Sequence, residues 1–398
     1  MELPSKITPR NTAILSVLLL SLSLAIFQNS NSNSPSENST EPTGYAYGPT
    51  GRIAYRYVDG QLERLSRNQI WSAQDNRKDS EFDPIRVAAY NSINSIQRDP
   101  NHSNIYFEEI IRDGFPTDIS QSIKLQSIDA ASYLSPLLDK KIQIKLILVT
   151  EKDQDFVNKE LPLIVPKYDW QGALDSLARY KTKEEFYSSS GTGGGTASFL
   201  VNENFGYYIG HTSSLATMET YWPEIAPHEM AHVLQGYLAK GFRSNYPDGH
   251  PQAKWARHLI EGSANTLGMA IGFKTLGWYS DEMDLLLQRS IEWINRDGSA
   301  EFKNKFPMQT DQDAYNLILA LEAAKGQELF DLSYSAGQFI WEFYIGKYGA
   351  NKYFELLKNV PKTQSLSDNF QTTLDISKEE FYRMAAPYLL TNWKRLIP

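Results

Sequence analysis

The second half of the chain constrains the fold most strongly, because almost all of it has the spacing of amphipathic helices. After Gln252, apolar residues recur at three- and four-residue intervals, which places them on one face of a helix. The segments with this spacing are 252–273, 282–295, 312–326, 333–348, 350–359 and 378–396. We therefore expect residues 241–398 to form a mainly helical C-terminal part.

The first half mixes helical and strand periodicities and predicts an α/β part over residues 45–240. Residues 52–65 alternate around Asp59–Gly60, which is the pattern of a β-hairpin. Lys141–Thr150 predicts a largely buried strand, and Ser127–Asp139 predicts the helix before it. Further helices are expected over 83–97, 151–161 and 170–186, and short strands over 197–204 and 205–212. Together the two halves indicate an α+β protein.

The glycine-rich segment Ser188–Phe199 predicts a flexible loop or a hairpin turn. It lacks the Gly-Lys-Ser/Thr ending of a phosphate-binding loop. No buried strand leads directly into it, so a nucleotide site is not expected here.

The N-terminal residues 1–27 have the pattern of an export signal. Lys6 and Arg10 precede the apolar run Ala13–Phe27, which is short for a full membrane span. No clear small-x-small cleavage site follows, so a cleaved signal peptide and an uncleaved signal anchor both stay open. Residues 28–44 are polar and predict a disordered linker. We expect the rest of the chain to be secreted or extracytoplasmic, with a possible membrane tether at the N-terminus.

Composition excludes several classes of function. The chain has no cysteine, which removes disulfides, thiolate metal sites and cysteine nucleophiles. Any metal must therefore be bound by histidine and carboxylate side chains. The formal net charge is −8, which argues against a nucleic-acid partner, since such partners favour a basic surface.

The stretch APHEMAHVLQG, residues 226–236, contains a candidate metal site. His228 and His232 are four residues apart, so on a helix they lie one above the other and can reach one Zn²⁺ ion. Glu229 is rotated by about 100° from His228, because each helical residue turns by that angle. It would therefore face a metal-bound water instead of the metal. Pro227 fits only near a helix start, which puts His228 close to the N-terminus of the helix.

Glu261 is the candidate third ligand. It follows two apolar residues and precedes an apolar helix, so its carboxylate needs a partner. Asn265, four residues later, would not bind the metal itself but is placed to hydrogen-bond a histidine that does. His258 lies on the same helical face as Glu261 and competes as third ligand, although orienting Glu261 or a substrate suits it better. A structural histidine pair with a salt-bridged Glu261 is the alternative that involves no metal.

HEMAH at 228–232 followed by EGSAN at 261–265 resembles the gluzincin metallopeptidases, whose pattern is HExxH with a glutamate ligand on a downstream helix. More loosely, the segment from Ser127 and the C-terminal helices resemble bacterial peptidase-MA-like domains. The resemblance implies a zincin-like catalytic unit that binds zinc through His228, His232 and Glu261. It also implies Glu229 as the general base for hydrolysis of a peptide or protein substrate.

This sequence departs from related patterns at defined positions. Several gluzincins have an aspartate where Asn265 stands, which would polarise the histidine more strongly. The GAMEN sequence of the aminopeptidase branch is absent, so an endopeptidase is the expected type. The metzincin extension also fails, because Gln235 and Leu238 occupy the places of its glycine and third histidine.

The expected chemistry needs one more donor. Zinc would lower the pKa of its bound water towards 7, and Glu229 would accept the proton during attack on the peptide carbonyl. The oxyanion requires a hydrogen-bond donor, for which Tyr334 is the candidate, with core packing as its alternative role. A strand within 199–210 would bind the substrate backbone at its edge. The alternative function is a catalytically silent zincin-fold surface or secreted binding protein, followed by a structural protein with incidental histidines.

Overall fold

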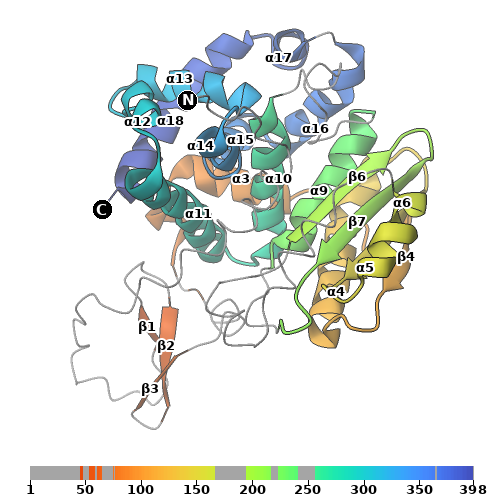
Figure 1. Ribbon diagram of the computed structural model, residues 1–398. Coiled ribbons are helices and arrows are strands. Elements are labelled where there is room, and N and C mark those ends of the chain that lie inside the picture. The colour runs from red at the N-terminus through yellow and green to blue at the C-terminus, as the bar shows by residue number, and fades with distance from the viewer. Residues whose placement is uncertain are drawn as a thin grey trace, which may run out of the picture.

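The computed structural model describes residues 45–47, 53–58, 61–64, 75, 77–165, 194–216, 223–240, 256–363 and 365–397. In these residues a small β-sheet lies beside a large group of helices (Figure 1). The arrangement is consistent with the expected α+β class. None of the helices in these ranges is long and apolar enough to cross a membrane, and residues 1–44 lie outside them.

A four-stranded sheet forms the core of the first half. Its strands are β4 (Ile105–Ile111), β5 (Ile142–Val149), β6 (Gly194–Leu200) and β7 (Phe205–His211). They lie in the order β4-β5-β7-β6, with β4, β5 and β7 parallel and β6 antiparallel to β7. Among the described strands, β6 therefore forms one edge of the sheet.

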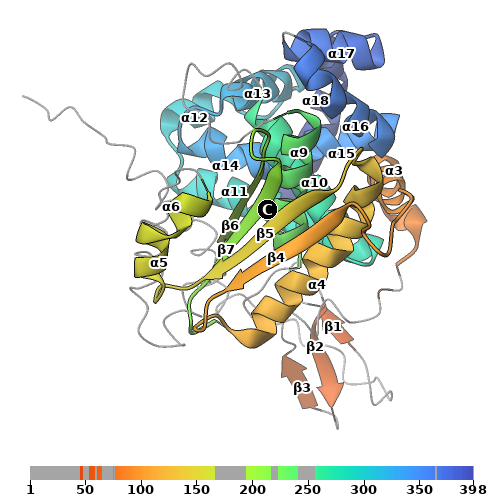
Figure 2. The same ribbon diagram turned by 90° about the vertical axis from the view of Figure 1, so that its right-hand side faces the viewer.

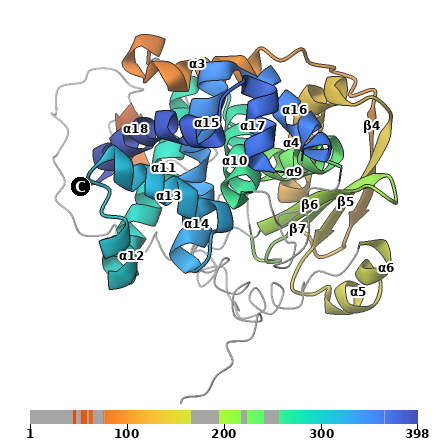
Figure 3. The ribbon, with the colours of Figure 1, turned by 90° about the horizontal axis from the view of Figure 1, so that it is seen from above.

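Helices cover both faces of this sheet (Figure 2). On one face lie α4 (Thr117–Leu134) and α9 (Ile225–Leu238), and on the other lie the short helices α5 (Gln154–Lys159) and α6 (Leu161–Ile164). The α4 and α9 face belongs to the main hydrophobic core, which continues into the helical half. A smaller core lies under α5 and α6. Helix α9 thus stands between the sheet and the C-terminal helices (Figure 3).

The C-terminal half is helical, as its periodicity predicts. Its helices are α10 (Arg257–Gly272), α11 (Leu276–Asp297), α12 (Ala300–Lys305), α13 (Asp311–Ala323), α14 (Gln327–Ser335), α15 (Gly337–Tyr348), α16 (Ala350–Asn359), α17 (Leu366–Leu374) and α18 (Lys378–Leu396). Helix α10 packs against both α9 and α15, so it joins the sheet side to the helical half.

One early helix belongs spatially with the C-terminal half. Helix α3 (Pro84–Asn94) packs against α15 and carries the buried Arg86. The Arg86 guanidinium donates to Glu342 Oε1 at 3.0 Å and to Asp284 Oδ1 at 2.8 Å, and Tyr388 donates to Glu342 Oε2 at 2.6 Å. A buried arginine requires such partners, so these bonds hold α3 against α11, α15 and α18.

The β-hairpin expected over 52–65 is present. Strands β2 (Ile53–Val58) and β3 (Gln61–Arg64) pair antiparallel, with Val58 opposite Gln61. A third strand, β1 (Tyr45–Tyr47), pairs with β2 and completes a separate small sheet. The helix predicted over 170–186 lies outside the described residues.

Several predicted boundaries were wrong. The helix predicted to start at Ser127 begins at Thr117, because Ile119 and Ile123 already bury one face of an otherwise polar turn. The glycine-rich segment is not a loop from residue 194 on: Gly194 begins strand β6. The helix predicted over 333–348 is two helices, since α14 ends at Ser335 and α15 begins at Gly337.

Other elements were missed by the periodicity. Strand β4 carries two glutamates in its centre and lies at the second edge of the sheet, so its burial alternates only weakly. Helices α12 and α17 are short, and each begins after a serine whose hydroxyl accepts a backbone N–H, at Ser299 and Ser365.

Candidate metal centre

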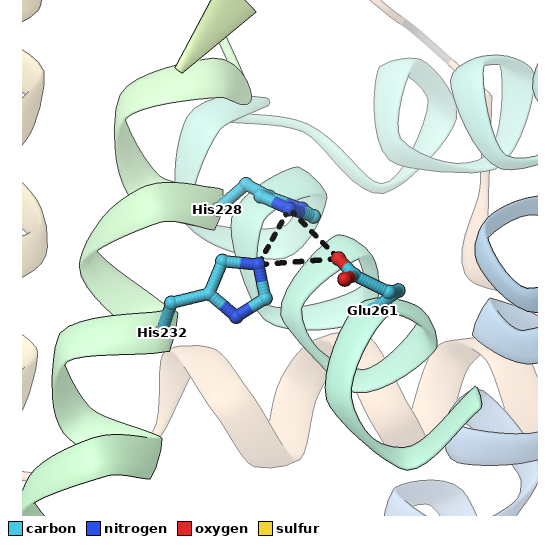
Figure 4. Close-up of side chains that lie close together, drawn as sticks. All are labelled: His228, His232 and Glu261. Carbon is cyan, nitrogen blue, oxygen red and sulfur yellow. Dashed lines mark hydrogen bonds and ion pairs between the residues drawn. The ribbon is translucent and has the colours of Figure 1, made fainter. Parts of the chain in front are cut away.

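His228, His232 and Glu261 lie together between helices α9 and α10 (Figure 4). One ligand atom from each lies within 4.8 Å of the other two. The two histidine Nε2 atoms are 3.0 Å apart, and Glu261 Oε2 lies 3.8 Å from His228 Nε2 and 3.3 Å from His232 Nε2. These are the three residues that the sequence motifs single out as metal ligands.

The local sequence explains why both histidines point the same way. Helix α9 begins at Ile225, so Pro227 falls within the first turn, where its missing N–H disrupts no helical hydrogen bond. His228 and His232 are then one turn apart on the face towards α10. The apolar neighbours Met230, Ala231 and Val233 are buried and hold the helix in the core.

A close approach of α10 brings Glu261 into position. Gly268 of α10 packs directly on the backbone of His228: a β-carbon added at Gly268 would lie 2.8 Å from the His228 nitrogen. Contacts this short essentially do not occur for real β-carbons, so only glycine permits this crossing. Glu261 lies two turns before Gly268 on α10, on the face that meets the histidines.

Gln235 binds His232 from the side away from the cluster. The Gln235 Oε1 atom lies 2.8 Å from His232 Nδ1, and its Nε2 atom donates to the Ile260 carbonyl at 2.9 Å. The same nitrogen lies 3.0 Å from Ser263 Oγ and 3.2 Å from Tyr353 Oη. Gln235 is almost completely buried, so its amide links α9 to α10 and α16 without competition from water.

His228 has its own neighbours. Asn265 makes a side-chain hydrogen bond to His228, as the sequence analysis expected for one of the two histidines. The ring of Tyr334, from α14, lies nearly parallel to the His228 ring, with 6.3 Å between the centroids. Tyr334 therefore lies beside the cluster.

The charges in the cluster shift one another's pKa values. Burial lowers the pKa of His232, but the charge of Glu261 outweighs burial and raises it to about 9. Burial and the charge of His232 lower the pKa of His228 to about 3. Burial raises the pKa of Glu261, but His232 and Arg257 outweigh it and lower that pKa to about 2. At neutral pH the cluster combines a carboxylate, a neutral imidazole and an imidazolium whose proton a cation would have to displace.

Glu229 lies on the sheet side of α9, against strand β6. A β-carbon at Gly195 would lie 2.9 Å from Glu229 Oε1, so the glycine leaves room for this carboxylate. Its Oε2 atom is buried and has no hydrogen-bond partner among the described residues. Burial raises the pKa of Glu229 to about 7, with His232 opposing that change. Glu229 is not part of the ligand cluster, which agrees with its rotation on the helix.

Arg257 is a neighbour of the site that no sequence motif indicates. Its Nη2 atom lies 3.4 Å from Glu261 Oε1 and donates to Tyr334 Oη at 3.3 Å. The guanidinium also stacks over the Phe330 ring, with 3.9 Å to the centroid. The four-residue spacing from Glu261 could have indicated an ion pair, but Tyr334 and Phe330 come from α14, which no local pattern connects to Arg257.

His258 does not belong to the site. Its Nε2 atom lies 3.0 Å from Tyr382 Oη, and its Nδ1 atom accepts from Trp341 Nε1 at 3.2 Å. Both ring nitrogens are therefore engaged in the aromatic core of α15 and α18, and the side chain is fully buried there. The expectation that His258 competes for the metal or orients Glu261 was wrong, because both of its ring nitrogens bond to aromatic side chains instead. These aromatic residues lie far away in the sequence, so no local pattern indicates them.

Comparison with known proteins found no counterpart for this chain: no family model, no curated protein and no solved structure matches it. The gluzincin assignment therefore depends on the motif and on the geometry described above.

Proposed function

We propose that this protein is a zinc-dependent peptidase of gluzincin type, with a zincin-like catalytic unit formed around α9 and α10. The observation that carries the proposal is the buried cluster of His228, His232 and Glu261, whose ligand atoms lie within 4.8 Å of one another. Glu229 lies beside it, and its Oε2 atom has no hydrogen-bond partner among the residues that the structure describes. Two imidazoles, one carboxylate and a separate acid are the groups that metal-assisted hydrolysis uses.

The donor set fits zinc better than calcium or magnesium. Those hard cations prefer oxygen ligands, whereas two imidazole nitrogens and one carboxylate oxygen suit Zn²⁺ with an open fourth position. The histidines also have the hydrogen-bond partners that ligating histidines need, Gln235 and Asn265. When bound, zinc would supply a water molecule of lowered pKa and polarise the substrate carbonyl.

The protein's own residues would move the proton and stabilise charge. Glu229 Oε2, which bonds to no side chain or backbone group in the described part of the chain, would accept a proton from the attacking water and then protonate the leaving amine. Tyr334 would donate its hydroxyl hydrogen to the carbonyl oxygen as negative charge develops there. Arg257, which donates to Tyr334 Oη, would leave that hydroxyl hydrogen available for the substrate.

Strand β6 is suited to bind an extended peptide. It pairs with β7 along one edge only among the described strands, and its Gly195 lies against the Glu229 carboxylate. A substrate strand added to an exposed sheet edge gains backbone hydrogen bonds that do not depend on side-chain identity. The proposed substrate is therefore a peptide or protein, cleaved outside the cytoplasm by a secreted or membrane-tethered enzyme.

Hydrolysis of a mixed peptide library tests this function. The purified protein, loaded with zinc, should cleave peptides at internal bonds, and removal of zinc with a chelator should abolish cleavage. Glu229→Gln should keep its zinc and lose activity by several orders of magnitude, because an amide cannot accept the proton. Normal cleavage by Glu229→Gln would show that the base is assigned wrongly. A wild-type protein that binds zinc and cleaves nothing would favour the alternative of a silent binding protein.

A further inference from the structure

The orientation of the Gln235 amide follows from its surroundings. One of its two polar atoms lies 2.9 Å from the carbonyl oxygen of Ile260, which can only accept a hydrogen bond. That atom must be the NH₂ group, so the other atom, which faces His232 Nδ1 at 2.8 Å, is the carbonyl oxygen. Because an amide oxygen only accepts, Nδ1 of His232 must carry a hydrogen.

A hydrogen on Nδ1 leaves Nε2 as the nitrogen that faces the cluster. In a neutral imidazole one nitrogen is protonated and the other has a lone pair, so this tautomer directs its lone pair towards His228 and Glu261. The amide is itself held on the opposite side, since Ser263 and Tyr353 also lie within hydrogen-bond distance of its nitrogen. We propose that Gln235 is a positioning residue that holds His232 as its Nδ1–H tautomer and so presents Nε2 to the metal. This inference rests on the proposed zinc-binding function.

A carboxylate could not replace this amide without loss. It would accept from His232 equally well, but it has no hydrogen for the Ile260 carbonyl, which would then lose its partner in a buried place. The neutral amide therefore fulfils two requirements at once: it orients the histidine and joins α9 to α10. Different substitutions of Gln235 can remove the hydrogen bond to Ile260 alone or the hydrogen bonds to both His232 and Ile260.

Two variants of Gln235 and one matched control test the proposal. Gln235→Met keeps the length of the side chain and removes the hydrogen bonds to His232 and Ile260, together with the polar contacts to Ser263 and Tyr353. Gln235→Glu keeps the acceptor for His232 and removes the donor to Ile260. Gln338→Met is the control, because Gln338 is equally buried and donates to the Met283 carbonyl at 2.8 Å, away from the cluster. Gln338→Met should lower the melting temperature without changing the zinc affinity or the tautomer of His232.

Three measurements are compared across these proteins: zinc affinity by chelator competition, thermal unfolding, and the protonated nitrogen of His232 by ¹⁵N NMR. The NMR spectrum is taken without metal at pH 10, where histidine is neutral, and is assigned with a His232→Asn variant. Gln235→Met should bind zinc about 10- to 100-fold more weakly and show a mixture of the two tautomers. Gln235→Glu should keep the Nδ1–H tautomer and wild-type zinc affinity, but unfold at a lower temperature.

Wild-type zinc affinity and an undisturbed Nδ1–H tautomer in Gln235→Met would overturn the proposal. So would a loss of zinc affinity in Gln338→Met equal to that in Gln235→Met, since the effect would then follow stability alone. If Gln235→Met does not fold, Gln235→Glu decides: a tautomer other than Nδ1–H contradicts the proposal. A wild-type protein without zinc affinity would overturn the proposed function, and the metal-free NMR spectrum would still decide the role of Gln235.

Discussion

Tyr334 either donates a hydrogen bond to the substrate or only packs beside His228, and a substitution distinguishes these two roles. Its ring packs beside His228, and its hydroxyl oxygen accepts from Arg257, while only part of the side chain is buried. If the hydroxyl donates to the developing oxyanion, Tyr334→Phe should lower kcat by about 10²-fold and leave KM and zinc content nearly unchanged. Tyr344→Phe is the control, because its hydroxyl donates to the Lys352 carbonyl in the helical half, away from the cluster. Near-normal turnover of Tyr334→Phe would leave it a packing role.

Zinc affinity should depend on pH through His232. Its pKa is about 9 because Glu261 outweighs the effect of burial, so below pH 9 a proton occupies the ligand nitrogen and must leave when metal binds. One displaced proton makes the affinity rise about tenfold per pH unit up to pH 9 and level off above it. Dissociation constants measured in chelator-buffered zinc between pH 7 and pH 10 check this slope. An affinity that does not change between pH 7 and pH 9 would contradict it.

The crossing of α9 and α10 sets the distance between the candidate ligands. A methyl group at Gly268 would meet the His228 backbone, so Gly268→Ala must separate the two helices. We expect a loss of about 1–3 kcal/mol in the free energy of unfolding, together with zinc affinity at least about tenfold weaker.

Gly346→Ala provides the matched comparison. A β-carbon there would lie 2.5 Å from the Ile85 carbonyl oxygen, a clash of the same kind between α15 and α3. It should destabilise the protein similarly and leave zinc affinity unchanged. If both variants lose zinc equally, the metal site responds to overall stability and not to the crossing of α9 and α10.

The elements differ in how far their sequence determines them. The strand over Ile142–Val149 and the helix over Lys378–Leu396 were predictable, because their own apolar spacing decides their burial. Strand β4 was not, since its Glu108 and Glu109 are acceptable only at the edge of a sheet that later residues complete. The break between α14 and α15 at Ala336 was not predictable from the local sequence. Gly337 packs against Gly262, which lies about 75 positions earlier in the chain.

The residues of the candidate site also differ in how far the sequence predicts their roles. His228, His232 and Glu261 were predictable because one helical repeat and one buried acid suffice to select them. The role of Gln235 was not, because its partners Ile260 and Tyr353 come from other helices. The role of His258 was not predictable either, because its partners Trp341 and Tyr382 are distant in the sequence.

The predicted division at residue 240 does not separate two independent cores. One hydrophobic cluster runs from the sheet side of α9 through α10 into the C-terminal helices. The candidate ligands come from both sides of that division, His228 and His232 from one and Glu261 from the other. The candidate metal site therefore requires the assembly of both halves, so any metal it binds would depend on the whole fold.

The proposed function depends on zinc binding by His228, His232 and Glu261. The most direct test is the zinc content of the purified protein after equilibration with zinc and removal of unbound metal. We predict about one zinc ion per chain, and almost none in His228→Ala, His232→Ala or Glu261→Ala, since each removes one of only three protein ligands. His102→Ala should keep its zinc, because His102 bonds to the Ile105 carbonyl away from the cluster. A wild-type protein without zinc, or full zinc content in the three ligand variants, would show that these side chains do not form a zinc site.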